Sequence, residues 1–269
     1  MISALRGMKD VLPPQSGLYE RIIKICEEVA KNYGYEFVLA PHLEQTALFR
    51  RSVGESSDIV GKEMYQFEDK GGNDVCLRPE GTAGVVRAFI EAKFDRAGGV
   101  RRYFYHGSMF RYERPQKGRL REFHQFGVES IGAESPLSDA EIIMLAVDFL
   151  QSLDMKDLSL SLNSVGCPRC RPKYREALKA YFREHLGELC KDCNDRFERS
   201  PLRILDCKID ADKPFMAGAP KITDCLCDEC KDHFERVKKL LTEAGIDFVL
   251  DPRLVRGLDY YTKTAFEIK

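Results

Sequence analysis

The stretch from residue 101 to residue 131 constrains the fold most, because it holds two apolar segments on either side of a strongly charged bend. Tyr103–Met109 and Phe123–Ile131 are rich in aromatic and apolar residues, and such runs are typical of strands. We therefore expect an antiparallel pair. The bend carries more fixed positive charge than a turn needs, in Arg111, Arg114, Lys117, Arg119 and Arg121. This charge indicates a polyphosphate site, while a solvated basic loop is the simpler explanation.

The composition is that of a globular chain with a full core. The 269 residues carry a formal net charge of -1, and 43% of them are hydrophobic, which suffices for a core and a second, smaller domain. Near-neutral charge argues against binding nucleic acid over the whole surface, although it allows a local basic site. No apolar run approaches a membrane span, and the first residues lack the apolar stretch of a secretion signal. We therefore expect a cytoplasmic protein without membrane contact.

Helical and strand patterns alternate along the rest of the chain. Apolar residues at three- and four-residue steps predict an amphipathic helix from Ser16 to Tyr33, followed by a strand over Tyr35–Ala40 that Pro41 ends. Glycines at the bend predict a hairpin over residues 64–79. The remaining predicted elements are a helix after Thr82, a helix over 138–150, a half-buried strand over Leu158–Asn163, a helix over Asp228–Ala244, and strands over Ile246–Leu250 and Leu254–Val255.

Glu80 and Thr82 lie where a predicted strand gives way to a helix. Such a junction fixes polar side chains at the edge of a pocket. A plain helix start, with Glu80 favoured by the helix dipole and Thr82 solvated, explains the same residues.

Four stretches together resemble the histidyl-tRNA synthetase family of class II aminoacyl-tRNA synthetases. They are the segments LRPEGTAG (77–84), MFRYERPQKGRLREFHQ (109–125), FGVE (126–129) and LVRGLDYY (254–261). The second has the pattern of class II motif 2. The predicted first helix, strand and Pro41 resemble motif 1, the dimer-forming element. RGLDYY is a signature of the histidine enzymes and is more specific than the motifs shared by the whole class.

The resemblance implies an α+β fold, with a class II synthetase-like antiparallel sheet flanked by helices and a mostly helical insertion domain. It divides the chain into a catalytic core, residues 1–165 and 246–269, and a Cys-rich insertion, residues 166–245. The family's insertion leans on the tRNA acceptor arm. Basic residues around Arg169–Arg175 and Arg196–Arg203 are compatible with phosphate contacts, and a solvated helix face explains them as well. A homodimer through the first helix and strand is also implied.

The activity that the resemblance implies is ATP-dependent activation of L-histidine to histidyl-adenylate, followed by transfer to tRNA(His), with Mg²⁺ on the phosphates. The histidine carboxylate and the α-phosphate are both anions, so fixed cations aimed at them are the main catalytic tool. The implied catalytic residues are Arg111 and Arg256, on opposite sides of the α-phosphate. Arg111, Glu113, Arg119 and Phe123 would bind ATP, where Glu113 reads the adenine amino group and Phe123 stacks on the purine.

The resemblance also assigns the residues that would bind histidine. A neutral imidazole presents one donor and one acceptor, and Glu129 and Tyr261 match the family positions that read the ring. Two strand aromatics, one of them facing the core, are the plain explanation of the Tyr260–Tyr261 pair. The full set implied for histidine is Glu80, Gly81, Thr82, Arg111, Gln125, Glu129, Arg256, Tyr260 and Tyr261.

Eight of the ten cysteines lie between Cys167 and Cys230. In a chain without a secretion signal, such clustering indicates metal binding or incidental thiols more than disulfides. Two C-x₂-C pairs predict one structural zinc set, Cys167, Cys170, Cys190 and Cys193. A second, less regular set is Cys207, Cys225, Cys227 and Cys230. Zinc would stabilise a small domain with little core, whereas reduced, partly buried thiols are the alternative, because the family does not as a rule require zinc.

The sequence ends at Lys269, eight residues after Tyr261. The family's motif 3 and its C-terminal anticodon-binding domain are therefore not in it. We expect a truncated catalytic fragment, with little or no ATP affinity of its own, rather than a divergent partial protein.

Two other functions compete with the synthetase. The synthetase-like regulatory subunit of the histidine-biosynthetic ATP phosphoribosyltransferase shares the fold but needs neither the insertion nor the paired arginines. A class II synthetase of another specificity is disfavoured by RGLDYY and Glu129.

Overall fold

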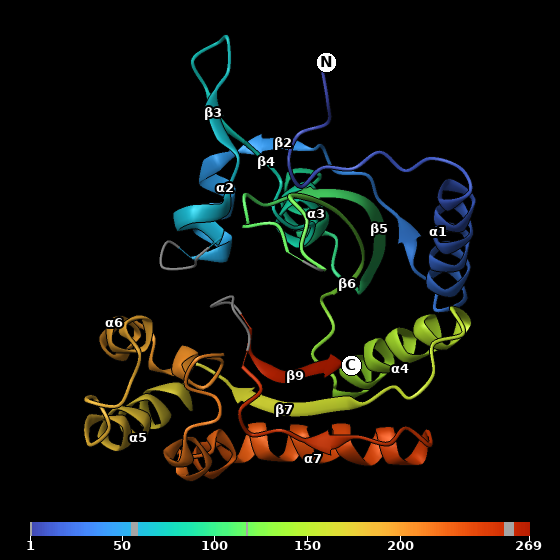
Figure 1. Ribbon diagram of the computed structural model, residues 1–269. Helices are drawn as coiled ribbons and strands as arrows, with labels where there is room; N and C mark the ends of the chain where they lie inside the picture. The colour runs from blue at the N-terminus through green and yellow to red at the C-terminus, as the bar shows by residue number, and fades with distance from the viewer. Residues whose placement is uncertain (1, 55–58, 117, 256–260) are drawn as a thin grey trace. The chain divides into compact units, whose positions relative to one another are not determined.

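The computed structural model describes residues 2–54, 59–116, 118–255 and 261–269 (Figure 1). By compactness the chain divides into two units, Met1–Glu134 with Leu145–Met155, and Ser135–Met144 with Lys156–Lys269. These boundaries differ from the predicted division into core and insertion, which is a functional division and stays a prediction. None of the described helices is long and apolar enough to cross a membrane.

The first unit is built on the predicted antiparallel pair. Strand β5 (Arg101–Phe110) pairs with β6 (Glu122–Ile131) over ten residues, from Arg101 opposite Ile131 to Phe110 opposite Glu122. Strand β1 (Glu36–Phe37) adds to the other edge of β5 in parallel. The strand prediction is confirmed, and the charged bend lies between the ends of β5 and β6.

Helix α1 (Gln15–Asn32) packs on this sheet and confirms the first predicted helix. It ends where Gly34 takes a φ of +75°, with N–H groups of Gly34 and Tyr35 donating back to carbonyls of the last turn. Glycine adopts this left-handed conformation without strain, so it is a common helix terminator. The buried face of α1, including Val29 and Ala30, packs against Phe104.

A second, antiparallel sheet in the same unit has the order β2-β4-β3. Its strands are β2 (Leu43–Gln45), β3 (Gln66–Glu68) and β4 (Asp74–Leu77), of which β3 and β4 form the predicted hairpin. Helix α2 (Thr46–Val53) and a π-helical turn, Ile59–Glu63, connect β2 to β3, and helix α3 (Thr82–Glu91) follows β4. A short 3₁₀ turn, Phe94–Arg96, leads to β5.

The second unit has a sheet of the order β8-β7-β9. Strand β7 (Leu160–Gly166) is antiparallel to β9 (Lys263–Ile268) and parallel to β8 (Val249–Leu250). Helix α7 (Asp228–Glu243) packs Phe234, Val237 and Leu241 on Leu160 and Leu162. Helix α4 (Pro136–Ser152) contributes to both units, because its Ala140 and Ile143 belong to this core and its Leu145 to the core of the first unit.

The predicted half-buried character of β7 is wrong, because all seven residues of the strand are buried. Two of its polar side chains, Asn163 and Ser164, donate hydrogen bonds to backbone carbonyls. The Asn163 side chain donates to the carbonyl of Leu254 (3.0 Å), and Ser164 Oγ donates to the carbonyl of Lys263 (3.1 Å). The predicted strand at Leu254–Val255 is also wrong, since these residues form no ladder, and β9 was not predicted.

The rest of the second unit confirms a mostly helical insertion. It contains α5 (Arg171–Arg183), α6 (Lys191–Arg199), and the 3₁₀ turns Pro201–Ile204, Pro214–Gly218 and Ile222–Cys225. These short elements share a core of their own, which includes Tyr174, Leu178, Phe182, Ile204 and Met216.

Candidate functional site

A buried carboxylate holds the start of helix α3. Glu80 is 5% exposed, and its two oxygens accept hydrogen bonds from the backbone N–H groups of Thr82 (2.6 Å) and Ala83 (2.9 Å). These donors belong to the first turn, where an α-helix leaves its N–H groups without intrahelical partners. Glu80 therefore caps α3 and fixes the backbone at Thr82, the first residue of the helix.

Thr82, Tyr105 and Glu129 form a hydrogen-bonded group. Thr82 Oγ1 donates to Oε1 of Glu129 (2.7 Å), and the Tyr105 hydroxyl donates to the same oxygen (3.3 Å). The pKa of Glu129 is raised to about 7, mainly because burial disfavours the charged carboxylate; the Thr82 bond lowers this pKa and the nearby Glu80 raises it. A glutamate that titrates near neutrality, beside two hydroxyl groups, is typical of a ligand site.

Two glycines make room for the ring of Tyr105. A Cβ added at Gly81 would lie 2.1 Å from a ring carbon, and one added at Gly127 would lie 2.4 Å from the ring and the hydroxyl. Only glycine lets the ring lie this close to both backbones. The space at Gly81 is therefore occupied by the ring of Tyr105, a residue for which the sequence predicted no role.

Gln125 lies on the same face of the β5–β6 pair. Gly107 is opposite Gln125 and Tyr105 is opposite Gly127, so these residues share a face with Glu129. Among the described residues, Oε1 of Gln125 is a buried acceptor with no hydrogen-bond partner. An unpaired buried acceptor is costly unless water or a ligand supplies a donor.

Arg78 is a second residue without a predicted role. It is buried, and it donates from Nε to the carbonyl of Ser108 (2.9 Å) and from Nη1 to that of Ala40 (2.8 Å). Burial lowers the pKa of its guanidinium. A Cβ at Gly107 would lie 2.8 Å from Nη2, so Arg78 needs this glycine. Arg78 ties the connection between β4 and α3 to strand β5.

Arg111 follows β5 at the edge of this group. Its Nε donates to the carbonyl of Pro79 (2.9 Å), and its guanidinium lies over the ring of Phe123, 5.1 Å from the ring centre. The ring contact is a cation–π interaction that fixes the plane of the guanidinium. The bond to Pro79 uses one of five N–H donors, so the group retains the capacity to bind an anion.

The bend beyond Arg111 is ordered by charge and ring contacts. Glu113 and Arg119, both predicted for ATP, form an ion pair of 2.8 Å. The Arg121 guanidinium lies 3.8 Å from the centre of the Tyr112 ring, and its Nε donates to the carbonyl of Glu113 (3.3 Å). Arg114 and Arg119 are exposed, as in a solvated basic loop, and the polyphosphate site stays a prediction.

The N-terminal arm also contacts the bend. The carbonyl of Gly7 accepts the N–H of Arg121 (2.8 Å). Gly7 has a φ of +84°, and a Cβ there would lie 2.9 Å from Cγ of Arg121. The glycine thus combines a left-handed conformation with close approach to a side chain. No role was predicted for Gly7 from the sequence, where it follows Arg6 and precedes Met8.

Glu80, Gly81, Thr82, Arg111, Phe123, Gln125 and Glu129 thus lie in the first unit, in or beside one hydrogen-bonded group. Arg256, Tyr260 and Lys117 lie outside the described residues. Tyr261 lies in the second unit, where it lines a cavity of about 650 Å³. The cavity also contains five basic residues of the insertion, Arg171, Arg175, Lys179, Arg199 and Arg203.

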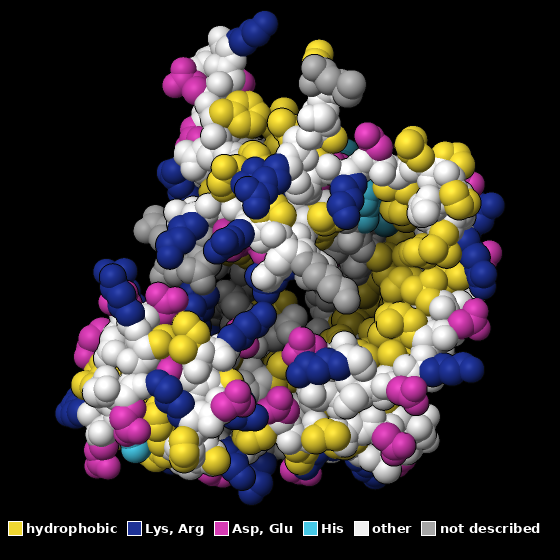
Figure 2. All heavy atoms as spheres, viewed as in Figure 1, with side chains coloured by type: hydrophobic (Ala, Val, Ile, Leu, Met, Phe, Trp, Pro, Cys, Tyr) yellow, Lys and Arg dark blue, Asp and Glu magenta, His cyan; other side chains and the backbone are white. Residues whose placement is uncertain are grey.

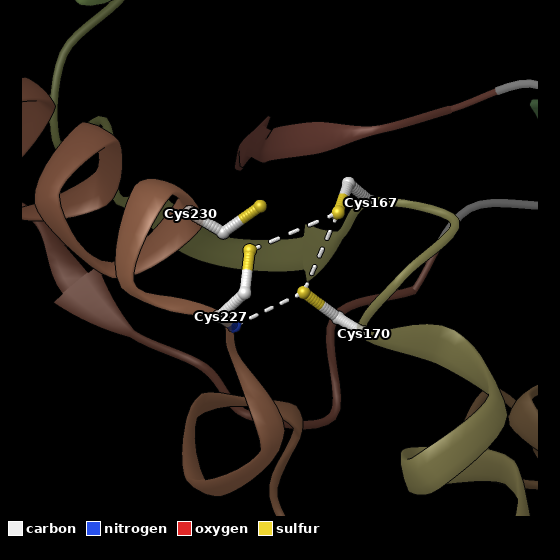
Figure 3. Close-up of side chains that lie close together, drawn as sticks. All are labelled: Cys167, Cys170, Cys227 and Cys230. Atoms are coloured by element: carbon white, nitrogen blue, oxygen red, sulfur yellow. Dashed lines mark hydrogen bonds between the residues drawn. The ribbon is translucent and has the colours of Figure 1, made fainter.

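The cysteines are brought together in groups that differ from the predicted ones. Cys167 and Cys170 meet Cys227 and Cys230 (Figure 3). Cys190 and Cys193 meet Cys207 and Asp210 instead. The predicted set of Cys167, Cys170, Cys190 and Cys193 is therefore wrong, and so is the second predicted set. Spacing along the chain identified the C-x₂-C pairs but not which pairs meet, because the pairing depends on how the intervening helices fold.

Known proteins share the sequence pattern of this chain. The sequence model of the histidyl-tRNA synthetase family matches residues 7–192. The chain belongs to this family. A histidine–tRNA ligase of Campylobacter hominis is 59% identical over 99% of the chain and 65% of that protein. The chain thus spans about 65% of the length of the curated relative it matches.

Two solved structures have the same fold. The apo histidyl-tRNA synthetase of S. aureus matches the whole chain and 61% of its own, with a TM-score of 0.78 and 41% identity. A protein of Bacillus halodurans described as an ATP phosphoribosyltransferase regulatory subunit/histidyl-tRNA synthetase covers the whole chain and 73% of its own, with a TM-score of 0.70 and 23% identity. The second likeness shows the fold alone. The predicted class II synthetase-like fold is confirmed.

Proposed function

We propose that the chain carries the histidine- and ATP-binding core of a histidine–tRNA ligase, which activates L-histidine to histidyl-adenylate and transfers it to tRNA(His). The observation that carries the proposal is the polar group of Thr82, Tyr105, Glu129 and Gln125 in a chain of this family. The group offers a carboxyl of raised pKa and a buried amide oxygen that needs a donor. Both suit a ligand that carries N–H groups.

The proposed selectivity follows from this chemistry. The N–H of an imidazole ring can donate to the carboxylate of Glu129, and the α-ammonium of histidine can donate to the oxygens of Gln125 and Glu80. A ligand without a ring N–H would give the buried carboxylate of Glu129 no donor beyond the hydroxyl groups of Thr82 and Tyr105. Sites with buried hydrogen-bonding groups reject such ligands by up to about four to five orders of magnitude. The roles of Tyr260 and Tyr261 in reading the ring stay predictions, because Tyr260 lies outside the described residues and Tyr261 lines the cavity of the second unit.

ATP would bind at the bend between β5 and β6. Arg111 would hold both the α-phosphate and the histidine carboxylate, and Arg256 would act on the other side of the phosphorus. Arg119 would bind the ATP phosphates, Glu113 the adenine amino group and Phe123 the purine ring. In the described structure Glu113 and Arg119 pair with each other, so ATP would have to exchange that ion pair for its own contacts. Mg²⁺ would come with the nucleotide, bound mainly through phosphate oxygens.

A tRNA partner is supported by the second unit. The cavity of about 650 Å³ is lined by Arg171, Arg175, Lys179, Arg199 and Arg203, and Glu176 is the one acid among the described residues that line it. Such a groove lined by cations suits a phosphate backbone. These residues include most of those for which the sequence predicted phosphate contacts.

A homodimer through α1 and β1 is supported by exposed apolar residues there. Leu18 is 60% exposed, Phe37 50% and Leu39 71%. Figure 2 shows hydrophobic side chains, in yellow, gathered on the visible face beside α1. Apolar groups exposed together are typical of protein interfaces. A second copy of the chain is the partner proposed for them.

Histidine binding tests the proposed function most directly. We expect calorimetry of the 269-residue chain to show binding of L-histidine but not of L-alanine. Glu129→Gln should weaken histidine binding by roughly ten- to a hundredfold, because a hydrogen bond to a charged group contributes about 1.5–3 kcal/mol. Glu134→Gln, an exposed acid just beyond β6, is the matched control and should bind as the unchanged chain does. Equal affinity for alanine and histidine would contradict the proposal.

A further inference from the structure

We propose that the insertion binds two structural zinc ions, one at Cys167, Cys170, Cys227 and Cys230 and one at Cys190, Cys193, Cys207 and Asp210. Within each group the ligand atoms all lie within 4.8 Å of one another. The groups account for seven of the eight cysteines between Cys167 and Cys230, and Cys225 is the one left out.

The sulfur separations in the first group are those of tetrahedral zinc. Cys167 Sγ lies 3.6 Å from Cys170 Sγ and 3.9 Å from Cys227 Sγ. Zinc bonds to thiolates are about 2.3 Å long, so a regular tetrahedron has sulfur–sulfur edges of about 3.8 Å. A disulfide would need about 2.05 Å, and all ten cysteines are free. Figure 3 shows the four sulfurs turned toward one another from two separate segments.

The surroundings of the first group stabilise thiolates. Cys170 precedes α5, and Cys227 precedes α7, whose first turn contains Cys230. Helix N-termini favour negative charge. The N–H of Cys227 donates to Sγ of Cys170 (3.2 Å), and the Arg169 guanidinium lies 4.0 Å from Sγ of Cys227. A zinc ion with four thiolates has a net charge of about -2. The N–H of Cys227 and the guanidinium of Arg169 offset this charge.

The second group has the same arrangement of ligands as the first, except that an aspartate stands in place of one cysteine. Each half of both groups has the spacing of C-x₂-C, except that Cys207 is followed at the same distance by Asp210. In the first group the backbone N–H of Cys227 donates to Sγ of Cys170. Cys227 is the first ligand of its pair, and Cys170 is the second ligand of the other pair. In the second group Cys190 donates in the same way to the carboxylate of Asp210 (3.1 and 3.3 Å). Asp210 therefore occupies the position of a sulfur ligand.

Burial and distance support a metal at the second group as well. Cys190 Sγ lies 3.7 Å from Cys207 Sγ, again close to the edge of a zinc tetrahedron. Asp210 is 0% exposed and is paired with Lys213 at 2.7 Å. A buried carboxylate among three sulfurs is costly unless cations compensate it, and zinc would do so at the centre of the group. Carboxylate oxygen is an ordinary zinc ligand.

The two groups are nested along the chain, with the second enclosed by the first. The first group joins the end of β7 to the start of α7, across 60 residues. Cys193 and Cys207 are part of the core of the intervening segment. Because that segment consists of short helices and turns, zinc would add to the stability that its core provides. Each ion would displace the thiol protons into solvent, and no oxidation is involved.

Zinc content measured by mass spectrometry tests the proposal. The chain, purified without chelator and desalted, should contain two zinc ions. Cys167→Ser should leave one, Cys207→Ser should leave one, and Cys225→Ser, the matched control, should leave two. A chain with no more zinc than the Cys167→Ser/Cys207→Ser double variant would overturn both sites. Equal zinc in one single variant and the unchanged chain would overturn the site that carries that substitution.

Cobalt gives a readout that does not depend on how the variants fold. Chain stripped of metal and titrated with Co²⁺ should develop the visible d–d bands and near-ultraviolet sulfur charge-transfer bands of tetrahedral cobalt thiolates, saturating at two equivalents. Zinc should remove these bands at the same stoichiometry. Absence of charge-transfer bands, or bands of octahedral cobalt, would overturn the proposed ligand sets, as would iron in place of zinc in the purified chain.

Discussion

The carboxyl of Glu129 lies among groups that act on its charge in opposite directions. Burial and the carboxylate of Glu80 favour the protonated form, whereas the donors Thr82 and Tyr105 favour the anion. Burial dominates, so the folded pKa of about 7 exceeds the ordinary value of 4.5. The ionised carboxylate of Glu129 is therefore unfavourable in the folded protein. A ligand that brings an N–H or a positive charge would stabilise it. Arg111, in contrast, is positioned by a backbone carbonyl and an aromatic ring, neither of which is an ionised group.

The raised pKa of Glu129 predicts how stability depends on pH. Between pH 4.5 and 7 the folded chain binds more protons at this residue than the unfolded chain does, so this contribution to stability falls as pH rises and is lost above 7. The loss amounts to at most about 3.5 kcal/mol, at about 1.4 kcal/mol per pKa unit. Glu129→Gln cannot ionise and should show a smaller decline in unfolding free energy between pH 5 and 8. Urea unfolding at both pH values measures it, and parallel declines in the two proteins would contradict the assignment.

Among the helices and strands, the hydrophobic pattern of the sequence predicted the structure well where one face of the helix or strand is exposed to water. Helix α1 and the β5–β6 pair follow this rule. Strand β7 does not, because its alternation of leucine with polar residues was interpreted as one solvated face, although every residue of β7 is buried and Asn163 donates to a backbone carbonyl. Strand β9 was not predicted, because it begins with the polar residues Lys263 and Thr264 and Glu267 separates its apolar residues Phe266 and Ile268. Tertiary partners, which a single sequence does not contain, decide such cases.

The side chain of Asn163 provides a test of this explanation of β7. It donates to the carbonyl of Leu254, which belongs to a segment without ladder bonds. Asn163→Ala should lower the unfolding free energy by about 1–3 kcal/mol, because it leaves a buried carbonyl without its donor. Ser159→Ala, an exposed residue just before the strand, should change it by less than about 0.5 kcal/mol. Equal effects of the two substitutions in urea unfolding would show that the polar face of β7 is not stabilised in this way.

At the scale of the whole molecule, the polar site could be predicted from the sequence and the metal groups only in part. Glu80, Thr82, Gln125 and Glu129 were identified by their places in family motifs, and the geometry brings them to one side of the β5–β6 pair. Tyr105 and Arg78 were not identified, because their role depends on glycines that approach them across the fold. The ligand sets of the cysteines depend on the nested path of the chain, which spacing alone leaves open.

The two compact units have separate cores, and both proposed zinc sites lie in the second unit. Removal of zinc should therefore loosen one part of the chain and leave the other. Hydrogen exchange in the presence of a chelator should show loss of amide protection in α5, α6 and the first turn of α7, while β5 and β6 keep theirs, because exchange reports local opening. The Cys167→Ser/Cys207→Ser double variant should lack this protection without chelator and should not respond to it. A loss spread evenly over both units, or no loss in α5 and α6, would mean that the cysteine groups do not stabilise the insertion through a metal.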